Sequence, residues 1–165
     1  LPGHFVQQVL LADLNEDGCK EIIFCGGDQV WIYWNDQGRF GPANRLIIEA
    51  KGFSTMFCVG ALRAEVADVD GDGKNELILA TEQGIEIRSA SDLKTVQTFF
   101  ALPYTSWISA ADLDGDGRLE LIAIKYENHI TYETESAIFG NGPAGLSSDR
   151  ISWVPTAGAM GNTWG

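Results

Sequence analysis

The sequence has few basic residues. Eleven Lys and Arg residues stand against 23 Asp and Glu residues, which gives a formal net charge of -12. Because such a chain is repelled by nucleic-acid phosphates and by anionic lipid headgroups, we expect no nucleic acid and no anionic membrane among its partners. Long apolar runs are also missing. The longest are about five residues, whereas a membrane-spanning helix needs roughly 20, so membrane insertion is not expected.

Cysteine is equally scarce. The chain contains only Cys19, Cys25 and Cys58, and no C-x-x-C pair, which argues against a zinc site. Cys19 and Cys25 bracket the run KEIIF. If this run is an extended strand, the two thiols lie too far apart to form a disulfide. We therefore expect free thiols, with Cys25 and Cys58 buried.

Two further signals are missing. No segment repeats its apolar residues with the 3.6-residue period of a helix. The chain begins LPGHFVQQVLL, without the basic start or cleavage pattern of a signal peptide, which fits a mature or excised fragment. The chain does contain 45% apolar residues among its 165. This is enough for a hydrophobic core, and we expect a single domain over residues 1–165.

One acidic motif occurs three times. The pattern A-D-[LV]-[DN]-x-D-G-x-x-E-[LI]-I has its first Asp at Asp13, Asp68 and Asp112, so the unit repeats after 55 and then 44 residues. Self-similarity at this period is typical of an array of supersecondary units. Twelve of the 23 acidic residues lie in these three nine-residue loops, at 13–21, 68–76 and 112–120.

Each loop is expected to join two strands of a four-stranded unit. A strand precedes each loop, and a β-branched run follows it: EIIFC, ELILA or ELIAI. The third strands are predicted at 28–34, 84–90 and 129–135, and the fourth at 44–50, 95–102 and 149–155. Turns at 26–27, 82–84 and 126–128 would join the second strand to the third. Such units are β-propeller blades, predicted at about 5–50, 62–102 and 106–155.

The ends of the units hold two irregularities. The longer first interval falls in residues 51–62, which we interpret as a longer connection between blades. Residues 159–165 resemble one extra strand. Because propellers usually need four to eight blades, an all-β segment of three antiparallel blades plus one strand belongs to a larger propeller or is completed by association.

The acidic loops have the composition of Ca²⁺ sites. Close carboxylates repel one another and raise their pKa values unless a cation binds, and an all-oxygen ligand set favours Ca²⁺ over Zn²⁺. The ligands would be the side chains at positions 1, 3, 5 and 9 and the carbonyl at position 7, with glycine at position 6 allowing the sharp turn. In chain order these residues are Asp13, Asn15, Asp17, Cys19, Glu21; Asp68, Asp70, Asp72, Lys74, Glu76; and Asp112, Asp114, Asp116, Arg118, Glu120.

Up to three Ca²⁺ ions are expected, and they would move the net charge from -12 to -6 by adding six positive charges. Asn15 removes one negative charge, so the first site is predicted to be the weakest. An EF-hand is excluded because position 12 holds Phe24, Leu79 or Ala123, which offer no side-chain oxygen. Plain Asp/Gly turns remain the alternative interpretation.

No catalytic group can be assigned from a motif. His4 and His129 lie outside any nucleophile pattern. Lys125, Tyr126, His129 and Tyr132 cluster around one predicted hairpin and could serve acid-base chemistry of a lyase kind, but we interpret them as ordinary surface polarity. Trp31 and Trp34 are three positions apart and face opposite sides of a strand, so one is expected between blades and the other partly exposed. Trp34 or Tyr33 could stack on a sugar. Trp107 and Trp153 are expected in the core.

The pattern D-x-D-G-D-G-x-x-[DE]-[LI] followed by a strand resembles the FG-GAP/VCBS repeats of integrin-α-like propellers. The stretch WIYWNDQGRFGPANRL at 31–46 is similar to their aromatic-glycine hairpin, and FG recurs at Phe139 and Gly140. The resemblance covers essentially the whole chain. It implies a seven- or eight-bladed propeller in full form, with Ca²⁺ in the hairpins between the first and second strands. Glu at position 9, where Asp is more usual, implies monodentate or water-assisted ligation.

These observations predict a non-catalytic, calcium-binding propeller module for extracellular binding, adhesion or assembly. Its partner would be a protein or glycan ligand, further propeller blades, or copies of the chain itself. Millimolar extracellular Ca²⁺ favours a secreted, cell-surface or periplasmic location. A lyase-like, polysaccharide-active enzyme and a self-assembling structural subunit are the alternatives. Such an enzyme would need acid-base residues outside the repeats.

Overall fold

In the computed structural model, described over residues 6–52, 62–89, 91–128, 133–143 and 145–155, twelve strands form three four-stranded antiparallel sheets. The prediction of an all-β propeller segment is confirmed. We call the sheets blades 1, 2 and 3. Blade 1 contains β1 (Gln8–Ala12), β2 (Glu21–Gly26), β3 (Gln29–Tyr33) and β4 (Arg45–Glu49). None of the described residues forms a helix that could span a membrane.

Blades 2 and 3 repeat this order, with neighbouring strands consecutive in the chain. Blade 2 contains β5 (Arg63–Ala67), β6 (Glu76–Ala80), β7 (Ile85–Arg88) and β8 (Val96–Phe100). Blade 3 contains β9 (Thr105–Ala111), β10 (Glu120–Asn128), β11 (Glu133–Gly142) and β12 (Gly145–Pro155). An Asp/Gly-rich loop joins the first strand of each blade to the second, whereas the other connections vary in length, from two residues between β2 and β3 to residues 34–44 between β3 and β4.

The third strand of blade 3 corrects the sequence prediction. It was expected at 129–135, but β11 runs from Glu133 to Gly142, and the turn predicted at 126–128 is a continuation of β10 with a register shift between Tyr126 and Asn128. Ser, Gly and Asn in ETESAIFGNG resemble turn residues, yet Phe139 is buried within this strand and contacts Phe100 of blade 2, with 4.6 Å between ring centroids. The buried aromatic contact therefore holds a glycine-rich segment in the sheet.

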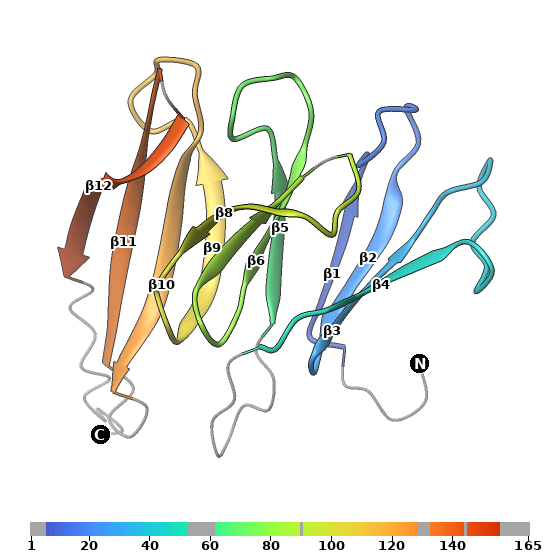
Figure 1. Ribbon diagram of the computed structural model, residues 1–165, viewed down its shortest axis with the longest axis horizontal. Helices are drawn as coiled ribbons and strands as arrows, with labels where there is room; N and C mark the ends of the chain where they lie inside the picture. Colours follow the sequence, from blue (N-terminus) through green and yellow to red (C-terminus); the bar gives the residue numbers. More distant parts are fainter. Residues whose placement is uncertain (1–5, 53–61, 90, 129–132, 144, 156–165) are drawn as a thin grey trace, which may run out of the picture.

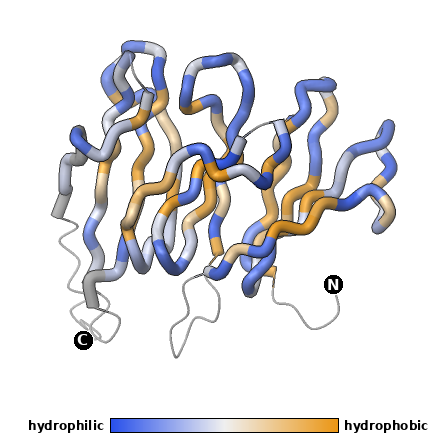
Figure 2. Tube along the Cα trace, viewed as in Figure 1, coloured by the Kyte–Doolittle hydropathy of each residue, from blue (hydrophilic) through white to orange (hydrophobic). Residues whose placement is uncertain are grey.

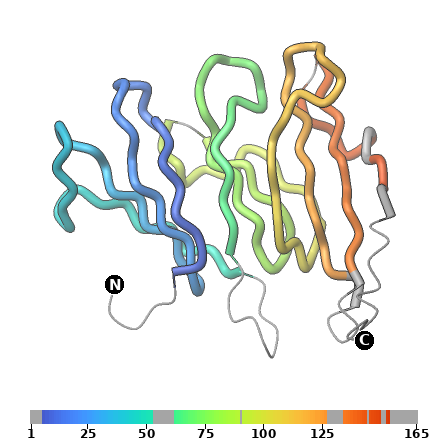
Figure 3. Tube along the Cα trace, turned by 180° about the vertical axis from the view of Figure 1, so that it is seen from behind, coloured from blue at the N-terminus to red at the C-terminus, as the bar shows by residue number. Residues whose placement is uncertain are grey.

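The blades stand side by side, with their first strands adjacent (Figure 1; Figure 3 shows the reverse side). The side-chain amide of Gln8 on β1 bonds both backbone groups of Ala64 on β5, at 2.8 and 3.0 Å. The Arg63 guanidinium on β5 lies 6.0 Å from the ring centre of Trp107 on β9. Adjacent first strands are the arrangement found around the axis of a propeller, and the three described sheets do not close into a ring.

Two hydrophobic cores fill the spaces between blades. β6 supplies both: Leu77 and Leu79 point into the core shared with blade 1, while Ile78 and Ala80 point into the core shared with blade 3. Because blade 2 is covered on both faces, every residue of β6 is buried, as is typical of a strand between two layers. In β2, buried and half-buried residues alternate. Figure 2 shows that the strands are largely apolar and the loops above them largely polar.

The burial of the tryptophan side chains agrees only in part with the sequence prediction. Trp31 is buried and Trp34 is half-buried, and it is the half-buried Trp34 that packs against the core between blades 1 and 2. Trp107 and Trp153 were expected in the core, but they are 51% and 47% exposed. Trp107 lies on the face of blade 3 that points away from blade 2, where none of the described sheets covers it. Most of the long connection at 51–62 and the strand predicted at 159–165 lie outside the described residues.

Candidate functional site

The three acidic loops emerge at the same end of the blades (Figure 1). Each connects the first strand of a blade to the second: β1 to β2, β5 to β6, and β9 to β10. Figure 2 shows that this end is the hydrophilic one. The three copies of the sequence motif therefore lie next to one another at one end of the blades.

The first Asp of each loop organises the backbone. In loop 2, Asp68 Oδ1 accepts the N–H of Gly71 at 2.7 Å, and its Oδ2 accepts the N–H of Gly73 at 2.9 Å. Loop 3 repeats both bonds from Gly115 and Gly117 to Asp112, at 2.7 and 3.0 Å. The Asp at position 5 accepts the N–H of position 7 in all three loops, at 2.8, 2.8 and 2.9 Å. These bonds bend the chain so that its carboxylates converge.

Two positions of each loop have left-handed backbone conformation. Position 6 is glycine throughout, as the sequence predicts, and the φ of Gly73 is 91°. Position 4 was missed. It is Gly71 in loop 2 and Gly115 in loop 3, with φ of 78° and 81°, but Glu16 in loop 1, with φ of 60°. A side chain is disfavoured at such φ values, so loop 1 carries local strain that the other two loops avoid. The D-G-D-G spacing of the other two loops was the available signal.

The Glu at position 9 ties each loop to its strand. Its Oε2 accepts the N–H of position 2: Leu14 to Glu21 at 2.7 Å, Val69 to Glu76 at 3.0 Å, and Leu113 to Glu120 at 2.8 Å. All three Glu residues are buried. A buried carboxylate needs compensating partners. In each of these Glu residues Oε2 is bonded to the backbone, which leaves the other oxygen for a second partner.

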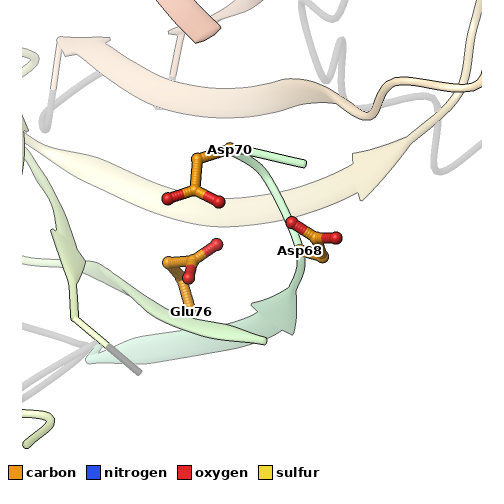
Figure 4. A group of neighbouring side chains, drawn as sticks. All are labelled: Asp68, Asp70 and Glu76. Carbon is orange, nitrogen blue, oxygen red and sulfur yellow. The ribbon is translucent and has the colours of Figure 1, made fainter. Parts of the chain in front are cut away.

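Carboxylates converge in loops 2 and 3. Oxygens of Asp68, Asp70 and Glu76 lie within 4.8 Å of one another, as do those of Asp112, Asp114 and Glu120. Figure 4 shows the first group around a common point. Two oxygens on one Ca²⁺ can be up to about 5 Å apart, so the groups fit this ion in spacing and in donor type. Asp72 and Asp116 at position 5 lie outside these groups.

Loop 1 places fewer charges at the same point. Asn15 stands at position 3, so only Asp13 and Glu21 occupy places that the other loops fill with three carboxylates. The amide of Asn15 instead donates to Asp17 at 3.0 Å. Glu21 Oε1 is buried and has no hydrogen-bond partner among the described residues. An unpaired buried carboxylate oxygen is costly, which leaves a place for a cation or a water.

The pKa values only partly follow the prediction that crowding raises them. Burial, followed by the nearby Asp carboxylates, raises the pKa of Glu76 to about 7. The prediction is wrong for Asp17. The backbone N–H of Cys19 and the amide of Asn15 hold the pKa of Asp17 below its usual value, because both stabilise the charged form.

The second loop adjoins two small hollows. One, of about 240 Å³, is lined by Asp70 and Glu76 and by Gly145 and Leu146 of the next blade. The other, of about 180 Å³, lies between loops 2 and 3 and includes Asp68, Asp70 and Asn141 among its lining residues. These hollows give an ion a route to the carboxylates.

Asn side chains connect neighbouring blades beside the loops. Asn75 Nδ2 donates to the Asp13 carbonyl at 3.1 Å. Asn141 Nδ2 donates to the carbonyls of Leu119 in its own blade and Val69 in blade 2, at 3.0 and 2.9 Å. The sequence did not predict either residue, because Asn75 lies at a variable position of the motif and Asn141 lies outside the motif. They couple the loop of one blade to that of the next.

Other residues singled out in the sequence lie away from the acidic carboxylate groups or beside loop 1. Trp34 lines an open hollow of about 460 Å³ with Asn15, Asn35, Asp36 and Asn44. Tyr33 lies elsewhere, edge-on to Phe24 with 5.8 Å between ring centroids and bonded by Arg45 at 3.2 Å. Cys19 and Cys25 are free, and burial raises the pKa of the Cys25 thiol to about 12; Cys58 lies outside the described residues.

The group considered for acid-base chemistry is only partly described. Lys125 forms an ion pair with Glu135, at 3.3 Å, and its ammonium group lies 4.7 Å from the ring centre of Trp153. The Tyr126 backbone N–H donates to the Tyr104 carbonyl at 3.1 Å. His4, His129 and Tyr132 lie outside the described residues. The described contacts therefore give the Lys125 ammonium a structural role.

Antiparallel four-stranded blades with an acidic loop between their first two strands define a β-propeller segment. The sequence profile of the FG-GAP-like repeat matches residues 13–79 and 68–123. The chain belongs to the FG-GAP-like repeat family.

No curated protein sequence matches the chain. Among solved structures, its fold is similar to that of a chain in the crystal structure of BBS1N in complex with ARL6DN, soaked with mercury, with a TM-score of 0.53 and 12% sequence identity. The match covers 90% of this chain and 44% of that chain, so this chain spans less than half of its neighbour's length.

Proposed function

We propose that the chain is a non-catalytic, calcium-stabilised β-propeller segment that serves as an extracellular binding or adhesion module. The observation that carries the proposal is the convergence of three carboxylates in loops 2 and 3, each including a buried Glu. Like charges at this spacing repel, and a hard divalent cation converts the repulsion into attraction. Membership of a repeat family with acidic loops supports the same conclusion.

The ion would be held by the side chains at positions 1, 3, 5 and 9 and the carbonyl at position 7. In loop 2 these are Asp68, Asp70, Asp72, the Lys74 carbonyl and Glu76. Asp68 and Glu76 already accept backbone N–H bonds, so their geometry is fixed before the ion enters. Ca²⁺ tolerates irregular coordination, whereas Mg²⁺ requires a near-ideal octahedron, which favours Ca²⁺.

Calorimetric titration tests the metal assignment. We expect Ca²⁺ to bind at up to three sites, with loop 1 the weakest because Asn15 supplies no charge. Asp114→Asn should remove one of the two stronger sites, while Asp28→Asn, at an exposed Asp outside the loops, should leave the binding curve unchanged. Absence of Ca²⁺ binding at millimolar concentration would contradict the proposal.

The affinity for Ca²⁺ also tests the proposed extracellular location. Extracellular Ca²⁺ modules bind at about 10⁻⁴ to 10⁻³ M, which matches the millimolar ion outside cells. We expect dissociation constants in this range. Submicromolar constants would fit a cytosolic protein and would argue against secretion.

The ligand of the module is proposed to be a protein or a glycan. A structure similar in fold contains a partner complex, which supports a protein ligand. The hollow beside loop 1 favours a glycan as the second candidate, because the half-buried Trp34 offers an apolar ring next to Asn44 and Asp36. The side chains of Asn44 and Asp36 make no hydrogen bond to the described residues, so both can bond sugar hydroxyls.

Screening neutral oligosaccharides by calorimetry would distinguish the two ligand classes. Trp34→Ala should abolish glycan binding, and Trp153→Ala, at an exposed Trp far from this hollow, should not. Binding that survives Trp34→Ala would place the sugar elsewhere, and no binding to any oligosaccharide would leave the protein ligand.

A further inference from the structure

Asn141 in β11 has one polar atom without a partner. Its side chain is buried, with 6% exposed, and its Oδ1 has no hydrogen-bond partner among the described residues. Its Nδ2 is fully used, because it donates to the carbonyls of Leu119 and Val69 at 3.0 and 2.9 Å. These two bonds also set the orientation of the amide, since the reverse orientation would place Oδ1 against two carbonyl oxygens. An unpaired buried oxygen is destabilising, so it indicates a ligand from outside the chain.

This side chain shares a hollow with the carboxylates of loop 2. The hollow between loops 2 and 3, of about 180 Å³, is lined by Asp68, Asp70, residues of loop 3 and Asn141. Asp68 and Asp70 are two of the three carboxylates that converge in loop 2. Arg118 also lines the hollow, but its guanidinium is paired with Asp116 at 2.8 Å. The hollow therefore brings a neutral oxygen of blade 3 together with two carboxylates of blade 2.

The other blades differ at the position of Asn141. Asn35 is its counterpart in blade 1, since each follows by two residues the third-strand residue that pairs with the first residue after the loop Glu. Both donate to the position-8 carbonyl of their own loop at 3.0 Å. The Oδ1 of Asn35, however, accepts the N–H of Gly38 at 2.6 Å. In blade 2 the sequence has Ala90 at this position, which offers no side-chain oxygen. Among these three residues, Asn141 is the one with an oxygen to offer.

We infer that Oδ1 of Asn141 is a further ligand of the Ca²⁺ ion that loop 2 binds, so that a single ion joins blade 2 to blade 3. The inference rests on the proposed Ca²⁺ site. The ligands proposed in loop 2 come from five residues, whereas Ca²⁺ takes about six to eight oxygens, including amide oxygens. The oxygen of Asn141 adds a donor without adding to the repulsion among the carboxylates. Its two N–H bonds hold the side chain in place before the ion enters.

The test isolates loop 2 in a parent chain that carries Asp17→Asn and Asp114→Asn, which remove one carboxylate from loop 1 and one from loop 3. Each new Asn keeps the oxygen that accepts a backbone N–H in its loop. Tb³⁺ is the probe, because its luminescence lifetimes in H₂O and D₂O count the water molecules on the ion. Asn141→Ala should add about one bound water and lower the Tb³⁺ affinity about tenfold. Asn35→Ala removes the same kind of bond in blade 1 and should change neither quantity.

Asn141→Asp separates a ligand from a residue that only joins the blades. Asp keeps a side-chain oxygen but loses both N–H bonds to the carbonyls of Val69 and Leu119. We expect it to restore the water count and the Tb³⁺ affinity of the parent chain. Its unfolding midpoint without metal should nevertheless fall below that of the parent, because a carboxylate then faces two carbonyls. A purely structural Asn141 would instead give Asp the same loss of metal affinity as Ala.

Two results with these variants would overturn the inference. One is an unchanged water count in Asn141→Ala, and the other is an Asn141→Asp variant that binds Tb³⁺ no better than Asn141→Ala. The parent chain supplies a test that does not depend on how the variants fold. In ¹³C NMR, Ca²⁺ should shift the side-chain carbonyl carbon of Asn141 and leave that of Asn35 in place.

The NMR titration also separates this inference from the proposed function. Ca²⁺ binding at loop 2 with an unchanged Asn141 carbonyl signal would contradict the inference alone. A wild-type chain that binds neither Ca²⁺ nor Tb³⁺ would contradict both.

Discussion

Calcium should raise the free energy of unfolding of this protein, mainly through binding at loops 2 and 3. A ligand that binds only the native state stabilises it by RT ln(1 + [L]/Kd). With about 2 mM Ca²⁺ and dissociation constants of about 0.1 to 1 mM, each site contributes about 0.6 to 1.8 kcal/mol. Loops 2 and 3, which gather three carboxylates each, would together contribute about 1 to 4 kcal/mol. For a domain of this size the midpoint would rise by about 3 to 14 °C.

The assay is thermal unfolding followed by circular dichroism, in buffer with Ca²⁺, with Mg²⁺ or with a chelator. Asp70→Asn removes one carboxylate of loop 2 and should reduce the Ca²⁺-dependent rise by about half, because the site in loop 3 is intact. Asp28→Asn changes the same charge outside the loops and controls for a general electrostatic effect. Mg²⁺ at the same concentration should stabilise less than Ca²⁺.

The reasoning would be refuted by equal midpoints with Ca²⁺ and with the chelator. A rise that Asp70→Asn and Asp28→Asn reduce equally would also refute it, because it would show screening of net charge and not binding at the loop. A rise of the same size with Mg²⁺ would keep a metal site but exclude the selectivity proposed for it.

Four further predictions concern the same loops and blade 2. Glu16→Gly should relieve the positive φ in loop 1 and raise the midpoint by about 1 to 3 °C, whereas Glu16→Ala should not, as thermal unfolding without Ca²⁺ would show. Because the pKa of Glu76 is about 7, the site in loop 2 must lose a proton to bind Ca²⁺, so its affinity should fall about tenfold between pH 8 and pH 6 in calorimetric titrations. Without Ca²⁺, that raised pKa favours the protonated native state, so stability should decrease as pH rises from about 4.5 to 7, which urea unfolding at several pH values measures. Gly84→Ala should destabilise blade 2 by several kcal/mol in urea unfolding, because a Cβ there would lie 2.1 Å from the Phe100 carbonyl oxygen.

The sequence predicts the blades well because their signals are local and repeated. Three acidic turns in the same repeated position locate the second strands, and a short apolar run such as ELILA directly after such a turn predicts a buried strand. The third strand of blade 3 was misplaced because residues near its C-terminal end, Gly140 and Asn141, are typical of turns. Long-range burial of Phe139 against Phe100 overrides that local preference.

The candidate site was predictable in its charges but not in its connections. Spacing alone places Asp68, Asp70 and Glu76 on one loop, and the structure brings their oxygens together. The inter-blade bonds of Asn75 and Asn141 depend on how blades pack, which no single repeat encodes. The exposure of Trp107 has the same origin, since its burial depends on whether a further blade is present.

The Glu at position 9 explains how metal binding and blade packing are connected. Its Oε2 fixes the N–H of position 2, and the side chain at that position, Leu14 or Val69, lies in the core between this blade and the next. Its other oxygen is available to the ion. A Ca²⁺ ion bound to this Glu would therefore reinforce the bond that positions the apolar side chain in the inter-blade core. An Asp, one methylene shorter, reaches less far toward both partners at once. In loops 1 and 2, Glu at position 9 would thus link a bound ion to the inter-blade core, and Ca²⁺ should rigidify the contact between blades as well as the loop that binds it.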